Sequence, residues 1–107
     1  MHWYYYVAYF FGGAFLANSI PHITNGISGR AFQSPFAKPP GECLSSSTVN
    51  VLWGFFNLVV AYVLVIHVGA FSLYNIWQVV SLGTGILLLS VMMARHFGRF
   101  HGGSLKS

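Results

Sequence analysis

The chain has 107 residues, of which 55% are hydrophobic and only 6% are charged, whereas a soluble domain carries about 25% charged residues. Its formal charge is +4, and Glu42 is its single acidic residue. One carboxylate is too few for hydrolysis by a carboxylate pair or for a cation site built from Asp and Glu. It also disfavours proton coupling through carboxylates inside the membrane. This composition excludes an ordinary soluble domain and predicts an all-α integral membrane protein.

The first apolar segment predicts a membrane-spanning helix over about residues 3–20. Pro21 removes a backbone donor and is expected to end it, although membrane helices tolerate proline and a kinked helix could continue toward Ile27. In that longer helix Gly12 and His22 would belong to one face of small and polar residues. We interpret this face as a surface for packing against another helix.

Residues 21–48 form a predicted loop that is rich in Pro, Gly and Ser. Its densest polar cluster is residues 21–26, followed by Gly29 and Arg30. His22, Asn25 and Arg30 are candidate contacts for a lipid headgroup, a quinone or a partner protein. We favour a helix exit with satisfied polar ends, because polar clusters at a membrane rim are often only connectors.

Residues 49–94 contain no Asp, Glu, Lys or Arg. Since about 20 apolar residues cross the ~30 Å hydrocarbon core, this run predicts two spans, about residues 49–68 and 73–94, joined by a tight turn. Together with the first segment, the sequence predicts three transmembrane helices in a single domain that covers residues 1–107.

Small and amide residues recur along one face of the second span. Asn50, Gly54, Asn57 and Ala61 follow the steps i, i+4, i+7 and i+11 of a helix. The third span carries Ser81 and Gly85, four residues apart. Such residues let helices approach closely and bond across the contact, so we favour helix packing over a lined path for a substrate.

The basic tail, residues 95–107, supplies candidate lipid-headgroup contacts at Arg95, Arg99 and Lys106. All five Lys and Arg fall in the first loop or this tail, which three spans place on the same side of the membrane. The positive-inside rule then predicts an external N-terminus and a cytoplasmic C-terminus. We expect a bacterial inner (plasma) membrane protein whose basic residues meet lipid rather than nucleic acid.

The histidines are the best candidates for chemistry. The predicted topology brings His22 and His96 to the same depth, where two imidazoles could ligate haem iron or a transition metal. The sequence supplies neither a carboxylate to orient them nor a Cys-x-x-Cys-His haem attachment motif. We therefore interpret both as polar ends of helices, and predict no cofactor and no firm metal site.

Three functions remain as hypotheses. The first is a non-catalytic accessory subunit of a larger membrane complex, or a homo-oligomeric membrane component, because no catalytic constellation is present and small-residue faces occur on every span. The second is an oligomeric channel or carrier for small molecules, with Asn50 and Asn57 lining its path. The third is a haem- or metal-binding redox subunit that uses His22 and His96.

Overall fold

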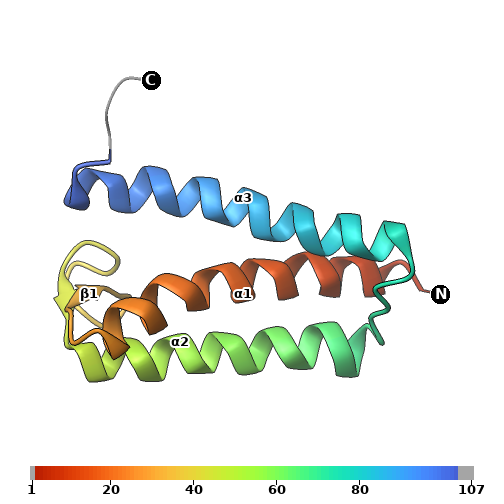
Figure 1. Cartoon of the computed structure of the whole chain (residues 1–107), viewed down its shortest axis with the longest axis horizontal. Helices are drawn as coiled ribbons and strands as arrows, with labels where there is room; N and C mark the ends of the chain where they lie inside the picture. The colour runs from red at the N-terminus through yellow and green to blue at the C-terminus, as the bar shows by residue number, and fades with distance from the viewer. Residues whose placement is uncertain (1, 104–107) are drawn as a thin grey trace.

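Three long helices lie side by side, each antiparallel to the one before it (Figure 1). The computed structural model describes residues 2–103, and the prediction of a mostly helical chain is confirmed. Two short strands, β1 and β2, pair antiparallel with Phe32 opposite Ser45. In chain order the elements are α1 (Tyr4–Ile27), β1 (Phe32–Gln33), β2 (Leu44–Ser45), α2 (Ser47–Tyr62), the π-helix η1 (Val63–Val68) and α3 (Ile76–His101).

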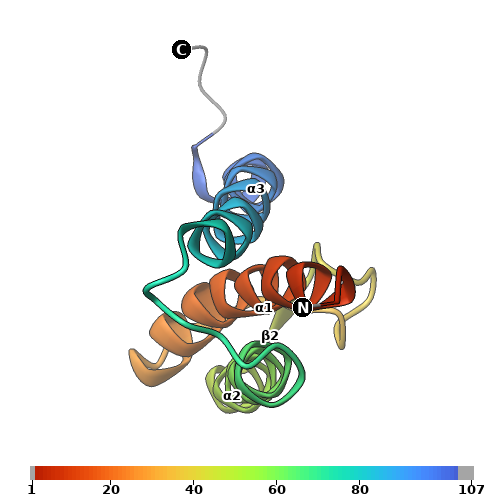
Figure 2. The same cartoon turned by 90° about the vertical axis from the view of Figure 1, so that its right-hand side faces the viewer.

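The first helix occupies the middle of the molecule. α1 packs along both α2 and α3, whereas α2 and α3 hardly touch each other. Figure 2, viewed along the helices, shows α1 between the other two, in a row rather than a triangle. The molecule accordingly measures 41 × 33 × 23 Å, and α1 is covered on only two of its sides.

The first helix continues through Pro21 to Ile27, past the end expected near residue 20. Polar side chains bond the carbonyl groups around the proline. Thr24 Oγ1 donates to the Ile20 carbonyl and Asn25 Nδ2 to the Pro21 carbonyl, both at 2.7 Å. The helix therefore continues past the proline with side chains bonded to the neighbouring carbonyls, as membrane helices that contain proline commonly do.

Local signals fix the ends of the other helices. Ser46 caps α2 by accepting from the Val49 amide at 3.2 Å, and Asn75 caps α3 by accepting from the Trp77 amide at 3.1 Å. Gly102 ends α3 in the left-handed conformation, with φ of 82°. Residues 95–101 of the expected tail are therefore helical, while Lys106 lies outside the described residues.

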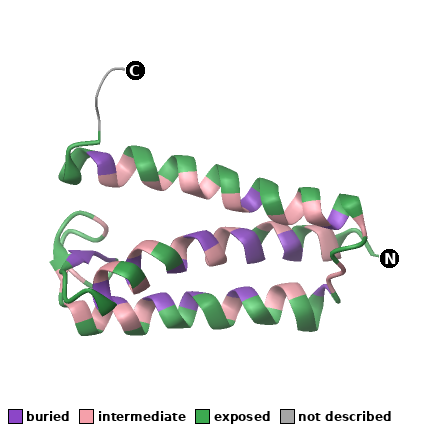
Figure 3. Cartoon of the chain, in the orientation of Figure 1, coloured by how far each residue is buried: buried purple, intermediate pink, exposed green. Residues whose placement is uncertain are grey.

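The burial pattern is the reverse of that in a soluble protein. Large apolar side chains on α2 and α3 lie outside, with Leu52 65% and Leu87 62% exposed. Figure 3 shows that the buried residues gather on α1 and on the faces turned toward it. Among the described residues, the buried polar ones are Ser19, His22, Gln33, Ser34, Asn50, Asn57 and Gln78, and the buried apolar ones are Ala8, Tyr9, Ala17, Phe32 and Ala61.

Two stretches of the described chain are long and apolar enough to cross a membrane, namely Ser47–Val68 and Ile76–His101. Only 17% and 11% of their apolar windows are buried in the chain, so neither resembles the core helix of a soluble fold. α1 does not meet the same criterion, because it mixes tyrosines, amides and a histidine with its apolar residues. The structure thus supports two of the three predicted spans.

Candidate functional site

The small-residue face of α2 lies against α1. Asn50, Gly54, Asn57 and Ala61 are the buried residues of α2. A methyl group added at Gly54 would lie 3.0 Å from the Ser19 carbonyl oxygen of α1, which shows how closely the two backbones approach. Across the same contact Asn18 Nδ2 donates to Asn57 Oδ1 at 3.0 Å, while Asn57 Nδ2 donates to the Trp53 carbonyl of its own helix at 2.8 Å.

The opposite side of α1 packs on α3 through a second set of small residues. Ser81 Oγ donates to the Tyr6 carbonyl at 2.6 Å. A methyl group at Gly85 would meet the Phe10 carbonyl oxygen, and one at Gly13 would meet the Leu82 carbonyl oxygen. Gly12, next to Gly13, faces α2 at Ala61 and η1 at Val65. Of these two adjacent glycines, Gly12 therefore allows close approach on the α2 side of α1, and Gly13 allows it on the α3 side.

Asn50 connects α1, α2 and the folded loop that follows α1. Its Nδ2 donates to the carbonyls of Phe32, Ser45 and Ser46 at 3.1, 3.2 and 3.0 Å. Because the nitrogen is turned toward carbonyls, Oδ1 is the acceptor, and His22 Nδ1 donates to it at 2.7 Å. Both side chains are almost completely buried, at 0% and 2% exposure. The loop is thereby held closed by one amide.

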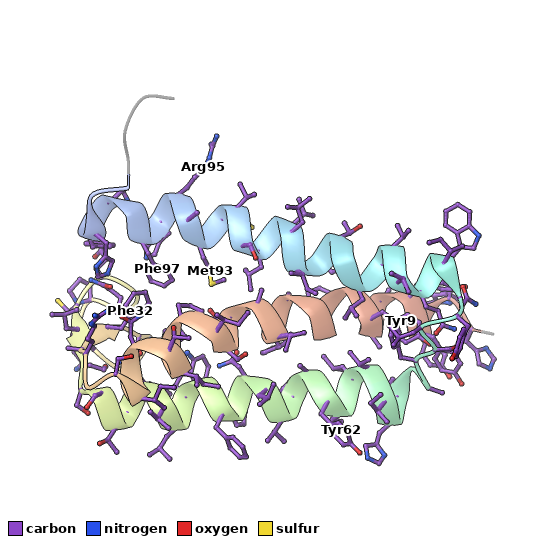
Figure 4. All side chains as sticks on the ribbon, viewed as in Figure 1. Tyr9, Phe32, Tyr62, Met93, Arg95 and Phe97 are labelled. Atoms are coloured by element: carbon purple, nitrogen blue, oxygen red, sulfur yellow. The ribbon has the colours of Figure 1, made fainter. Side chains whose placement is uncertain are left out.

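An aromatic cluster fills the space between this loop and the end of α3. Figure 4 shows Phe32 and Phe97 turned toward each other, and their ring centroids are 4.7 Å apart. His101 stacks on Phe32 at 5.1 Å, and its Nε2 pairs with Gln33 Oε1 at 2.7 Å. These contacts join β1 to the last turns of α3, which are nearly 70 positions apart in the chain. We call this part of the molecule its closed end.

A cavity of about 330 Å³ lies at this end. Its polar lining comes from α1, α2 and the loop, and its apolar lining consists of prolines and aromatic rings. The indole nitrogen of Trp53 is buried and is the sole buried side-chain N or O atom of residues 2–103 without a hydrogen-bond partner. The lining residues are Asn18, His22, Gln33, Ser34, Pro35, Pro40, Gly41, Trp53 and Phe97.

The structure does not join His22 and His96 in one ligand set. His96 Nε2 donates to the Gly41 carbonyl at 2.6 Å, and Arg99 Nη2 lies 2.6 Å from Nδ1, so both ring nitrogens are engaged. The described residues contain no group of three or more His, Cys, Asp or Glu side chains close enough to hold a metal ion. His96 therefore fastens the loop to α3.

The remaining predicted contacts lie at the same end of the molecule. Arg30, Arg95 and Arg99 are exposed, and Figure 4 shows Arg95 extending away from α1. Asn25 is half-buried and bonds its own helix. The described Lys and Arg residues therefore lie at the closed end, whereas residues 2–27 and the turn after η1 contain none.

Sequence reasoning missed three residues that matter at these contacts. Gly13 was overlooked although the pair Gly12–Gly13 is a visible signal for close approach on two sides. Trp53 is the second, and nothing in the sequence around it indicates that its indole N–H is buried without a partner. Tyr9 is fully buried and its hydroxyl donates to the Gly69 carbonyl, a contact across 60 positions that no local pattern reveals.

These features together describe a class of protein, a mostly helical chain with two helices able to cross a membrane, with both polar and apolar residues buried inside and large apolar side chains exposed outside. Comparison with known proteins finds no matching family model, no matching curated protein and no matching solved structure.

Proposed function

We propose that this chain is a three-span integral membrane protein of a bacterial inner membrane, with an external N-terminus and a cytoplasmic C-terminus. It acts as a non-catalytic subunit, either of a larger complex or of a homo-oligomer. The observation that carries the proposal is the arrangement of polarity, in which buried amides join the helices and large apolar side chains cover the outside. Without water outside, helices associate through small residues and interhelical hydrogen bonds.

The position of α1 explains how it can be a span although it is less apolar than its neighbours. Flanking helices cover it on two sides, so its polar residues meet protein rather than lipid. The sides that stay open carry Val7, Phe11 and Ile20, which are 42%, 50% and 55% exposed. A helix of 24 residues is about 36 Å long, enough for the ~30 Å hydrocarbon core.

Association with another chain is favoured by the open sides of the helix row. A groove of about 280 Å³ crosses α1 between α2 and α3, with Gly12 and Ala61 among its lining and Leu82 on its far wall. Gly12 and Ala61 are themselves buried against each other, so a further helix would pack on the larger apolar side chains that line the rest of the groove. We therefore favour a partner or a second copy over a monomer surrounded by lipid alone.

The alternative functions receive less support from the geometry. Asn50 and Asn57 have no exposed surface, and their amide groups form hydrogen bonds within the chain. This favours a role in helix packing over a role in lining a path for solutes. In the redox hypothesis His22 and His96 would need free ring nitrogens facing one ligand, and His96 has both of its nitrogens engaged.

The orientation predicts opposite labelling of two positions. Cys43 is the single cysteine and lies exposed at the closed end, and Tyr74 is fully exposed at the other end. In intact cells, a membrane-impermeant maleimide should label the variant Cys43→Ser/Tyr74→Cys and leave Cys43 of the parent chain unlabelled. After permeabilisation both should react. The reverse pattern would contradict the orientation, and labelling of both from outside would contradict three spans.

The subunit proposal predicts a fixed stoichiometry. We expect tagged protein purified from its own host in mild detergent to retain either one partner chain at a constant ratio or a defined number of its own copies. Quantitative mass spectrometry and native mass determination measure both. A lipid-solvated monomer that carries nothing else would contradict the proposal.

A further inference from the structure

The cavity at the closed end, described above, holds donors and acceptors that the protein leaves unused. His22 Nδ1 donates to Asn50, so Nε2 of this neutral imidazole is an acceptor, and no hydrogen bond links it to another residue within 2–103. Asn18 likewise uses Nδ2 on Asn57 and keeps Oδ1 without a bond in that range. These two acceptors are one helical turn apart on α1, and both residues line the cavity.

Donors come from the other walls of the same cavity. The Trp53 indole N–H is buried without an acceptor, and Gln33, whose Oε1 pairs with His101, keeps its amide N–H groups without a bond in the described chain. A buried polar group without a partner costs about 1–3 kcal/mol. A ligand that accepts from the Trp53 N–H would remove this cost, and it would also pair with His22 Nε2 and Asn18 Oδ1, which are not among the buried atoms without a partner.

The lining also limits the charge and shape of that ligand. It contains no Lys, Arg, Asp or Glu among the described residues, so a phosphate or carboxylate headgroup would find no countercharge. Its apolar part includes the rings of Trp53 and Phe97, which suit a flat aromatic ring. At about 330 Å³ it has room for one ring with its substituents.

Trp53 also lines a second, outward-facing hollow of about 520 Å³ on α2, which is almost wholly apolar and includes Phe36, Leu52 and Phe56. A hydrocarbon tail attached to a ring in the cavity would find an apolar surface directly beside it. This assignment of the tail rests on the proposed membrane location, whereas the ring site depends only on the cavity.

We propose that this cavity binds the uncharged ring of a membrane quinol. One ring hydroxyl donates to His22 Nε2, and ring oxygens accept from Trp53 and Gln33. The reduced form is favoured over the quinone, because the quinone has acceptors alone and cannot donate to His22 or Asn18.

Single-tryptophan variants test the location of binding. The chain has three tryptophans, so Trp3→Phe/Trp77→Phe leaves Trp53 as the reporter, and Trp3→Phe/Trp53→Phe leaves Trp77 at the other end as the matched control. Purified in detergent micelles, each is titrated with decylubiquinol while fluorescence is recorded. We expect a saturable change at Trp53 and a weak, non-saturable one at Trp77. Equal responses at both positions would overturn the proposal.

A second measurement tests the hydrogen bonds. Trp53→Phe alone removes an N–H that has no partner in the described chain, so the fold should persist while decylubiquinol binds about tenfold more weakly. Trp77→Phe should bind as the parent chain does. Unchanged affinity in Trp53→Phe, or equal affinity of the parent for monoolein, would reject the quinol. Neither result would alter the subunit stoichiometry, so the two proposals fail separately.

Discussion

Replacing Gly85 by alanine is expected to separate α1 from α3 and to destabilise the protein by about 3 kcal/mol. The added methyl group would meet the carbonyl oxygen of Phe10, which is backbone and cannot move aside as a side chain does. Unfolding by SDS added to mild-detergent micelles, followed by far-UV circular dichroism, measures the loss. The Ser81–Tyr6 hydrogen bond across the same contact should weaken with it.

Gly83 is the matched control on the same helix. A methyl group at Gly83 has no atom within 4 Å, so Gly83→Ala should not destabilise the protein and should add about 0.5–1 kcal/mol through helix propensity. If both variants unfold at the same SDS fraction, the close approach of α1 and α3 at Gly85 is wrong. A large effect of Gly83→Ala alone would place another chain on the outer face of α3.

Replacing Asn50 by leucine is expected to open the loop between α1 and α2. Leucine fits the volume but removes the donors to the Phe32 and Ser45 carbonyls and the acceptor of His22, at a cost of about 3 kcal/mol. Hydrogen–deuterium exchange in residues 28–46 should rise strongly. Exchange in the middle of α3 should stay unchanged, because Asn50 forms no hydrogen bond to that helix.

Asn57→Leu is the control for the Asn50 variant, because it removes a buried amide from the same face seven residues further on. It loses the bond from Asn18 and weakens the α1–α2 contact, but none of its hydrogen bonds reaches the loop. The loop should therefore stay protected in Asn57→Leu. Equal loop opening in both variants would contradict the role of Asn50 as the clamp.

Much of the helix packing could be predicted because its signals are periodic and local. The face with Asn50, Gly54, Asn57 and Ala61 follows from helical steps alone, and the structure places all four against α1. The gathering of cations at one end follows from counting charged residues along the chain. Three spans and the orientation stay predictions, since the structure supports two candidate spans.

The closed end could not be predicted, because it depends on contacts between distant residues. Pro21 is a local stop signal, yet the side chains of Thr24 and Asn25 bond the backbone around it and α1 continues. The mutual ring contacts of His22, Phe32 and Phe97 join three segments that no sequence window contains together. The cavity exists only once these segments have met.

The order in which the helices are made adds a requirement on biogenesis. The central helix leaves the ribosome first, yet its two neighbours follow it, and the contact at Gly85 needs a residue about 75 positions after Phe10. Until α2 and α3 have been synthesised, no neighbouring helix covers the polar side chains of α1, which include Asn18 and His22. In the proposed three-span protein, stable membrane insertion of α1 would depend on completion of the later helices, and chains truncated before α3 should be substrates for membrane proteases.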